Sequence, residues 1–357
     1  MRMANQVKRR DPRIDTIKGI LIVLVVFGHY LWGYREFPVV EEMVELIYLF
    51  HMPAFIFISG FLSKDVLPIS WKSIAQLLVS YVLINSLMMF FCFVYRGSDI
   101  MLLTPYYSCW YLLALVIWRV TLPFLANHRF ALFATVAFSL AIGFSDEVTN
   151  KFALARAIAF YPFFIGGFLS KKHGFMERTG SARCRTVGIA VFAGTLFVSY
   201  FLIEALGIAS GDMLMQSYSK EVLLFDLIRR AVILLLAAVL SVSLCCLVPR
   251  KPVPFITKWG KNSLTIYLFH RVFPLLLLGA MPVGQFDGVY WVVMIIGSFA
   301  TLLVLGSDAV EARYRDFVFR ITEVLFADRD DAVYWRKKQS LLTVFVVFAL
   351  AVLVAQG

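Results

Sequence analysis

Charged side chains are scarce in this sequence of 357 residues. Asp, Glu, Lys and Arg together make up 16% of the chain, whereas hydrophobic residues make up 61% and the mean hydropathy is +0.80. A soluble globular domain carries about 25% charged and roughly 45–50% apolar residues. The shortage of charge therefore excludes a soluble multi-domain enzyme and a disordered or fibrous chain. It predicts an all-α, polytopic integral membrane protein.

Several other signals are missing. The five cysteines show no CxxC pattern and no Cys/His ligand spacing, so we expect neither a disulfide framework nor a metal site. The N-terminal apolar run is too long for a cleavable signal and lacks a small-residue cleavage site, which predicts a retained first span. No linker rich in Pro, Gly or Ser and no sizeable extramembrane domain is present. Any chemistry must therefore take place within a helical bundle.

Long apolar runs recur from one end of the chain to the other. A helix needs about 20 apolar residues to cross the hydrocarbon core. We predict eleven transmembrane helices, near residues 14–34, 44–62, 73–95, 105–126, 130–146, 152–170, 186–207, 222–248, 262–281, 288–306 and 340–356. The segment from 308 to 326 mixes apolar and charged residues, so we expect a helix along the cytoplasmic surface there.

The positive charge is distributed unevenly between the loops. The net charge of +11 would suggest nucleic acid in a soluble protein, but here the basic residues flank apolar spans, so we expect no nucleic-acid partner. With the N-terminus in the cytoplasm, the outer segments hold few basic residues: Arg35, Arg96, Lys151 and Lys220. Nearly all other Lys and Arg residues outside the spans then face the cytoplasm, as the positive-inside rule requires. The orientation also supports the span count.

Ionisable groups are costly within a bilayer, so those inside the first span are candidates for function. Lys18 and His29 are eleven residues apart, which is roughly 16 Å along a helix and places them on one face. Asp15 lies on that face one turn before Lys18, and Arg13 precedes it. The span thus places cations at the cytoplasmic mouth and an imidazole deep in the bundle, a layout that suits a CoA thioester. A snorkelling lysine and a structural histidine explain the same pattern equally well.

Two further spans carry polar groups. In the second span His51 stands beside Pro53, which predicts a break or kink, and Ser59-Gly60 allows close helix approach. In the ninth span Tyr267 and His270 lie one turn apart, close to the face of Arg271. A polar seam between helices is as good an explanation as an active role.

The remaining candidates are weaker. Trp110 opens the fourth span among other aromatic residues, which an interfacial belt also explains. The candidate arginines within or beside spans are Arg119, Arg156, Arg229 and Arg230. Arg119 lies in the cytoplasmic half of its span and would join the Lys18 site. For all four arginines, snorkelling to an interface competes with a substrate contact.

These motifs together resemble the membrane acyltransferase family 3, in particular its branch similar to fucose 4-O-acetylases. The matching pieces run in family order over residues 13 to 306: Asp15-x-x-Lys18-Gly19 with His29 after ten residues, Phe50-His51-Met52-Pro53 to Ser59-Gly60, Trp110-Tyr111-Leu112, Pro162-Phe163-Phe164-x-Gly166-Gly167, and Asn262-Ser263 to Tyr267 and His270. The chain departs from the family in two places. Lys18 stands where the family often has Arg, and a span near 340–356 is added to a core of ten helices. The resemblance therefore implies an acyltransferase domain over 1–326, followed over 327–357 by a cytoplasmic linker and one extra helix.

The resemblance implies transfer of an acyl group from a cytoplasmic acyl-CoA, usually acetyl-CoA, to a hydroxyl of a cell-surface or secreted polysaccharide or its lipid-linked precursor. His29 then looks like the catalytic histidine, with Lys18, Arg13 and Arg119 on the donor. We expect His29 to act as a general base, with a transient acyl-histidine as the competing route.

Under this hypothesis Asp15 belongs to the catalytic set, and Ser59, Trp110, Tyr267 and His270 are candidates for stabilising the oxyanion. The expected acceptor contacts are His51, Arg156, Arg229, Arg230 and Arg271. The expected setting is the bacterial inner membrane, among membrane lipids and beside polysaccharide synthesis or export machinery. A transporter or flippase of a charged glycan or lipid, and a structural scaffold, remain as alternatives.

Overall fold

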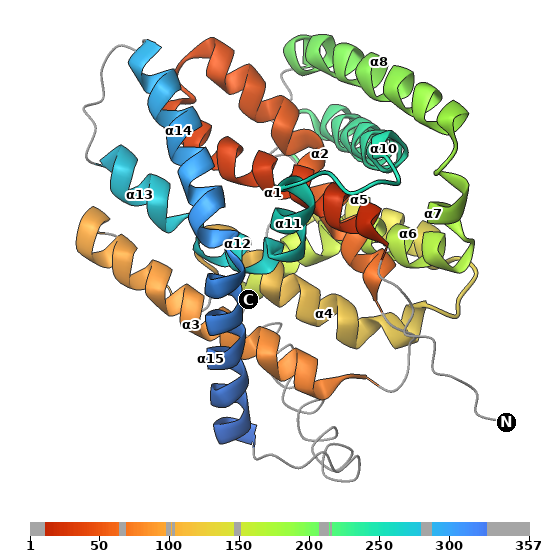
Figure 1. Cartoon of the computed structure of the whole chain (residues 1–357). Helices are drawn as coiled ribbons and strands as arrows, with labels where there is room; N and C mark the ends of the chain where they lie inside the picture. The colour runs from red at the N-terminus through yellow and green to blue at the C-terminus, as the bar shows by residue number, and fades with distance from the viewer. Residues whose placement is uncertain are drawn as a thin grey trace, which may run out of the picture. The chain divides into compact units, whose positions relative to one another are not determined.

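The structure is a computed structural model and describes residues 11–63, 69–97, 101, 104–145, 151–206, 214, 216–279 and 288–326. Within these residues every assigned element is helical (Figure 1). The predicted linker and the eleventh predicted span, near 340–356, lie outside the described residues.

Eight described helices are long and apolar enough to cross a membrane: α1 (Pro12–Leu31), α2 (Pro38–Leu62), α3 (Trp71–Arg96), α4 (Trp110–Leu125), α6 (Leu154–Lys172), α8 (Ala182–Leu206), α10 (Leu223–Leu247) and α14 (Gly288–Leu305). Each coincides with a predicted span. The prediction of a polytopic helical membrane bundle is therefore confirmed.

The other helices are shorter or amphipathic. They are α5 (Ala131–Ala141), α7 (Phe175–Arg178), α11 (Ile256–Lys261), α12 (Ser263–Phe269), α13 (Val272–Gly279) and α15 (Asp308–Phe326). Among the described residues, four single turns of 3₁₀-helix accompany them: η1 (Trp32–Tyr34), η2 (Tyr107–Cys109), η3 (Ile142–Phe144) and η4 (Lys151–Ala153). The helix expected over 308–326 is confirmed with those bounds. At the predicted fifth span, α5 and η3 form an apolar helical segment that is shorter than the eight candidate spans.

The ninth span is not the continuous helix that the apolar run predicts. It is divided at His270 and Arg271 into α12 and α13. Pro274 explains the division, because a proline has no N–H to donate to the carbonyl of the residue four positions earlier, which is His270. That carbonyl instead accepts a hydrogen bond from the amide of Phe273, at 3.3 Å. By contrast, α2 continues through Pro53 without the break considered from the sequence.

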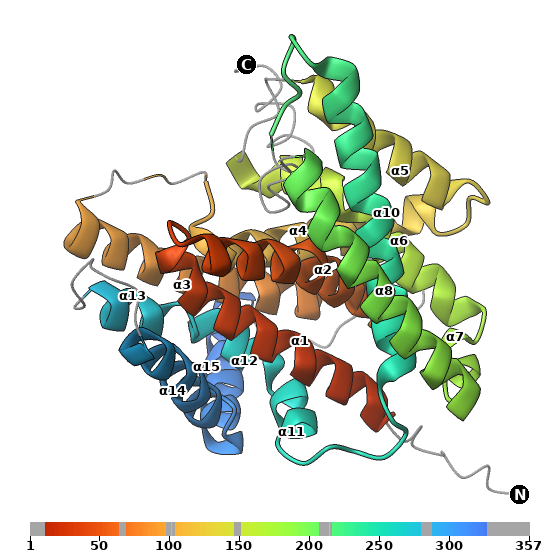
Figure 2. The same ribbon diagram turned by 90° about the horizontal axis from the view of Figure 1, so that it is seen from above.

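The chain forms two compact units. The first comprises residues 1–63 and 162–311, and the second comprises 64–161 and 312–357. In the first unit α1 packs against α2, α11, α12 and α14, while α10 packs against α2 and α8 (Figures 1 and 2). The first unit therefore surrounds α1, the helix with Lys18 and His29, on several sides.

Glycines allow the closest helix contacts of the first unit. A Cβ on Gly260 of α11 would lie 1.6 Å from the carbonyl oxygen of Asp15, and one on Gly19 would lie 1.9 Å from that of Ile256. The same reciprocal arrangement joins α2 to α6. There a Cβ on Gly60 would lie 1.9 Å from the Phe164 carbonyl oxygen. The close approach expected at Ser59-Gly60 is confirmed.

The second unit is organised around α3 and α4. These two helices pack against each other. The indole Nε1 of Trp118 in α4 donates a hydrogen bond to the carbonyl of Ala157 at the start of α6, at 2.8 Å. In α15, the hydroxyl of Tyr314 donates to Ser80 of α3, at 2.6 Å. Side-chain hydrogen bonds therefore tie segments that are distant in sequence into this unit.

Candidate functional site

Three histidines from three segments of the first unit gather around the C-terminal end of α1. The rings of His29 and His270 stack at a centroid distance of 5.0 Å. Tyr48 connects the third histidine, because its ring lies 4.7 Å from that of His51 and 5.8 Å from that of His29. Tyr267 packs against His270 at 5.8 Å. We call this set, with Arg271, the His29 cluster.

The hydrogen bonds of His29 fix its tautomer. Arg271 Nη1 lies 2.9 Å from Nδ1 of His29, and the Tyr48 hydroxyl lies 2.8 Å from the same nitrogen. A guanidinium can only donate, so Nδ1 must be the nitrogen without a proton. We therefore assign the proton of neutral His29 to Nε2, and the Tyr48 hydroxyl also donates to Nδ1. The basic lone pair of His29 faces Arg271 and Tyr48.

His51 and His270 each donate an N–H hydrogen bond to a backbone carbonyl oxygen. Nδ1 of His51 donates to the Ile47 carbonyl at 2.8 Å, and Nδ1 of His270 donates to the Tyr267 carbonyl at 2.7 Å. In neutral His270, Nε2 then carries only a lone pair. It is buried without a hydrogen-bond partner among the described residues. Neutral His270 therefore has no free N–H with which to stabilise an oxyanion.

Arg271 reaches His29 because the ninth span is broken. The side chain is 7% exposed, and Nη1 lies 3.4 Å from the carbonyl oxygen of His29 in addition to its contact with Nδ1. Arg271 follows the last residue of α12 by two positions and precedes α13. A buried guanidinium is thus held against the imidazole at the interruption, where a continuous apolar helix was expected.

Four residues of this neighbourhood were not among the sequence candidates: Trp32, Arg35, Glu45 and Tyr48. The Trp32 and Tyr48 rings lie 5.0 Å apart, and the Arg35 guanidinium lies 4.3 Å from the Trp32 ring centroid. Arg35 also forms a 3.0 Å ion pair with Glu45, whose side chain is buried. The signal was present in the spacing, because Glu45, Tyr48 and His51 follow one another at one-turn intervals on α2.

The N-terminal end of α1 holds the predicted donor cations Arg13 and Lys18, each next to a carboxylate. Arg13 binds Asp11 through Nε and Nη2, the latter at 2.7 Å. Lys18 Nζ lies 3.6 Å from Asp15, which is 1% exposed. This geometry supports a structural role for Lys18 beside any role in binding the donor.

Two lysines, Lys258 and Lys261, lie on α11, the helix that packs against α1. Lys258 is 3.2 Å from Asp308, and Lys261 ends the helix. Hydrogen bonds from Asn262 and Lys258, with the positive charge of Lys258 and Lys261, lower the pKa of Asp308. This end of the first unit therefore presents more positive charge than α1 alone supplies.

Three other candidates of the first unit, Ser59, Arg229 and Arg230, make contacts outside the His29 cluster. The Ser59 hydroxyl donates to the Phe55 carbonyl of its own helix, at 2.9 Å. At the start of α10, Arg229 pairs with Asp226 at 3.1 Å, and Arg230 donates to the Gln216 carbonyl. The structure places none of them in the His29 cluster.

The remaining candidates belong to the second unit. Trp110 begins α4, and the guanidinium of Arg156 lies 5.5 Å from its ring centroid. Arg119 lies further along α4 and is partly buried. Trp110 and Arg156 thus contact each other within this unit.

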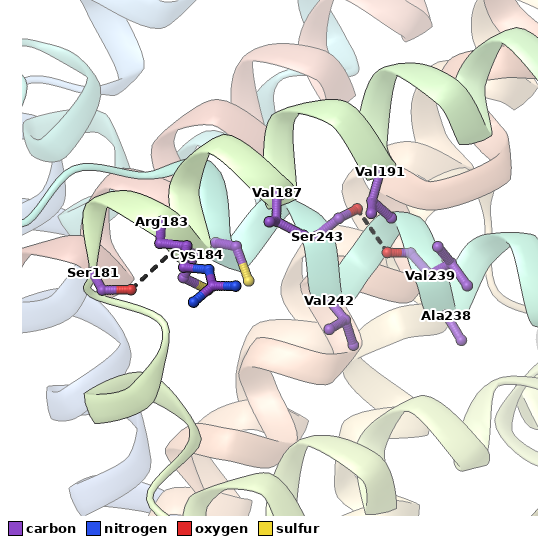
Figure 3. A pocket seen from close by; sticks show the side chains of 11 residues that line it. Ser181, Arg183, Cys184, Val187, Val191, Ala238, Val239, Val242 and Ser243 are labelled. Atoms are coloured by element: carbon purple, nitrogen blue, oxygen red, sulfur yellow. Dashed lines mark hydrogen bonds between the residues drawn. The ribbon is translucent and has the colours of Figure 1, made fainter.

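The described residues include no candidate metal site, and the cavity in Figure 3 is not lined by the His29 cluster. In the part of the chain that the structure describes, no three His, Cys, Asp or Glu side chains form a group able to hold a metal ion. A cavity of about 630 Å³ lies between α8 and α10 (Figure 3). Its walls are mainly aliphatic, with Arg183, Cys184 and Cys246 among the lining residues. No residue of the His29 cluster lines it.

Comparison with known proteins identifies the family. Residues 11–306 match acyltransferase family 3, described as an acyltransferase domain. The chain belongs to this family. The match begins at the N-cap of α1 and ends directly after α14, so it includes Lys18, His29 and the broken ninth span. The resemblance drawn from the motifs over 13 to 306 is confirmed.

A shorter match links the chain to one curated protein. Over 59 residues it is 46% identical to nodulation protein NolL of Sinorhizobium fredii, which is 15% of this chain. The match spans 16% of the length of that relative. No solved structure matches the chain.

Family membership and the eight candidate spans thus indicate a membrane protein with an acyltransferase domain. The family does not by itself assign a role to any residue of the His29 cluster.

Proposed function

We propose that this membrane acyltransferase moves an acyl group, normally acetyl, from cytoplasmic acyl-CoA to a hydroxyl of a cell-surface or secreted polysaccharide or its lipid-linked precursor. The proposal places it in the bacterial cytoplasmic membrane. One observation carries it. Nδ1 of His29 presents a lone pair to an arginine and a tyrosine inside a membrane helix bundle.

His29 acts as the general base in this proposal. Its lone pair is on Nδ1, so that nitrogen gains a proton as the acceptor hydroxyl loses one. The hydroxyl oxygen then forms a bond to the thioester carbon, and the carbon–sulfur bond breaks. The CoA thiolate takes up the proton from His29 as it leaves. No acyl-enzyme forms on this direct route, so an acylated His29 found by mass spectrometry without acceptor would contradict it.

Arg271 is the oxyanion donor that the geometry favours. Once Nδ1 is protonated it can no longer accept a hydrogen bond, and the Nη1–H of Arg271 becomes available. A buried guanidinium beside the reacting atoms stabilises negative charge strongly, because little water screens it. Arg271 therefore takes the place of His270 in our proposal, since neutral His270 has no free N–H. Tyr267 supports the His270 ring.

The donor enters from the cytoplasmic end of α1. The phosphates of acyl-CoA are bound there by Lys18 and Arg13, with Lys258 and Lys261 of α11 as additional cations. Because Lys18 already faces Asp15, phosphate binding must replace part of that ion pair. Lysine offers a point charge and not a bidentate fork. A contribution of Arg119 to this donor site stays a prediction.

The acceptor approaches the opposite end, where His51 and Tyr48 belong to the His29 cluster. Binding of the acceptor by Arg156, Arg229 and Arg230 stays a prediction. The latter two are engaged with Asp226 and the Gln216 carbonyl, so they would need to exchange these partners.

The test is turnover of acetyl-CoA by the purified protein in nanodiscs, with polysaccharide of the producing bacterium, de-O-acetylated in mild alkali, as the acceptor. We expect His29→Ala to lower kcat by about 10²–10⁴-fold, because it removes a general base. Lys18→Ala should raise the KM for acetyl-CoA with little change in kcat.

The matched control for Lys18 is the double variant Asp15→Asn with Lys18→Ala. The single Lys18 variant leaves Asp15 buried without that cation and can fail through misfolding. The double variant removes both charges. If it recovers stability but not acetyl-CoA affinity, Lys18 binds the donor. If it recovers both, Lys18 serves only to neutralise Asp15. Wild-type protein that neither binds nor consumes acyl-CoA would refute the proposed function.

A further inference from the structure

Tyr48 is in direct contact with His29. It belongs to α2, one turn before His51, and its side chain is partly exposed, as is that of His29. Its hydroxyl lies 2.8 Å from Nδ1 of His29. Neither family membership nor the sequence motifs assign a role to this residue.

The hydrogen-bond roles around Nδ1 determine what Tyr48 can do. Because Arg271 can only donate to Nδ1, the Tyr48 hydroxyl must also donate its proton to that nitrogen. The lone pairs of the Tyr48 oxygen then have no donor among the described residues. The other ring nitrogen of His29 carries a proton and cannot take one. A hydroxyl that approaches His29 thus meets the Tyr48 oxygen as a ready hydrogen-bond acceptor.

The Tyr48 ring is held firmly in this position. Trp32 lies against it at 5.0 Å, and His51 meets it edge-on at 4.7 Å. Trp32 is itself covered by Arg35, which is anchored to the buried carboxylate of Glu45. Contacts on two sides therefore fix the direction in which the hydroxyl points.

We propose that Tyr48 is a catalytic residue that receives the proton of the acceptor hydroxyl and passes its own proton to Nδ1 of His29. The acceptor O–H bond breaks as the Tyr48 oxygen gains that proton, and the Tyr48 O–H bond breaks as Nδ1 gains the other. Tyr48 is unchanged after the step, and His29 carries one added proton. The acceptor oxygen attacks the thioester carbon. The inference rests on the proposed function, because it assumes an acyl-CoA donor and a hydroxyl acceptor.

The first test is Tyr48→Phe, which keeps the ring and its packing but removes the hydroxyl. Transfer from acetyl-CoA to the de-O-acetylated polysaccharide should fall in kcat by about 10²–10⁴-fold, the usual contribution of a proton-transfer group. The Kd for acetyl-CoA should not change. Tyr34→Phe is the matched control, because Tyr34 lies in η1 at the same end of α1, outside the His29 cluster. It should keep wild-type kcat.

A second variant separates proton transfer from simple positioning of His29. Replacing Tyr48 with 3-fluorotyrosine keeps the hydroxyl and nearly the same volume but makes the phenol more acidic. If Tyr48 transfers a proton, the pH profile of kcat must shift. If it only orients His29, the profile stays as in the wild type. This variant also serves if Tyr48→Phe does not fold.

The possible results distinguish failure of the Tyr48 proton relay from failure of the proposed acyltransferase function. Wild-type turnover with a Tyr48→Phe kcat within threefold of it overturns the relay and leaves the proposed function standing. An unshifted pH profile in the fluorotyrosine variant overturns it as well. If the wild type consumes no acetyl-CoA, with either polysaccharide or water as acceptor, the proposed function fails and the relay fails with it.

Discussion

Arg271 approaches His29 at two atoms, the Nδ1 nitrogen and the backbone carbonyl oxygen. One guanidinium therefore sets both the tautomer of the imidazole and the position of the helix that carries it. Both contacts are made by Nη1, so the position of this one guanidinium nitrogen determines them.

Substitution of Arg271 tests this role. Arg271→Gln removes the charge and should lower kcat by about 10²–10³-fold, the usual cost of losing an oxyanion donor. Arg271→Lys keeps the positive charge, but its compact ammonium ends a side chain of different length and shape and does not occupy the position of Nη1, so we expect a kcat between those of the wild type and Arg271→Gln. The measurement is acetyl-CoA turnover, with the thermal unfolding temperature as the folding control. A glutamine variant that retains wild-type kcat and wild-type stability would contradict the role.

Individual residues differ in how visible they are in the sequence. Lys18 and His29 stand out because ionisable groups are rare in apolar spans, and their helical spacing alone suggests a common face. Tyr48 does not stand out, because tyrosine is frequent near membrane interfaces and packs well with other aromatic residues. Its proposed role depends on a hydrogen bond to a residue in another helix, which periodicity does not reveal.

At the scale of elements, the broken ninth span depends on Pro274. Pro274→Ala would supply the missing N–H to the His270 carbonyl and favour one continuous helix. We expect the unfolding temperature to stay the same or rise, while kcat falls at least tenfold because Arg271 moves away from His29. Pro123→Ala is the matched control, since Pro123 also lies inside a helix, α4, but is no part of the His29 cluster. Unchanged turnover in Pro274→Ala would show that the break is not needed.

The contact between α1 and α11 gives a second prediction at this scale. Gly260→Ala would place a methyl group 1.6 Å from the Asp15 carbonyl oxygen, so the helices must separate. We expect a loss of about 1–3 kcal/mol or more, as for other overpacked sites. Gly194→Ala in α8 is the control, because a Cβ there meets nothing within 4 Å. Thermal unfolding in detergent measures both, and equal stability of the two variants would contradict this close contact.

The sequence predicted the helices well where their positions follow from hydropathy. Eight long helices and α15 fall where apolar runs and amphipathic spacing place them. The helix α11 and the interruption at His270 and Arg271 did not follow from hydropathy. The first is a short helix whose glycine fits against α1. The second results from a proline within an otherwise apolar run.

At the scale of the whole molecule, the proposal requires the two ends of α1 to face opposite sides of the membrane. A cysteine introduced at Glu42, which is exposed near the start of α2, should react with a membrane-impermeant maleimide in intact spheroplasts. Cys184, near the start of α8, should react only after the membrane is permeabilised. Since Cys184 is one of five native cysteines, each target is examined with the others replaced by serine. The reverse pattern of labelling would contradict the orientation with a cytoplasmic N-terminus.

The distance in sequence between His29 and Arg271 also affects how the protein matures. The two residues are separated by 242 positions, so the histidine is synthesised with the first span and the arginine with the ninth. During biosynthesis the chain holds the imidazole in the membrane long before its guanidinium partner exists. A chain that ends before the ninth span therefore has the histidine without the arginine that our proposal pairs with it. The proposed mechanism therefore predicts that competence for acyl transfer arises only after the ninth span has been inserted.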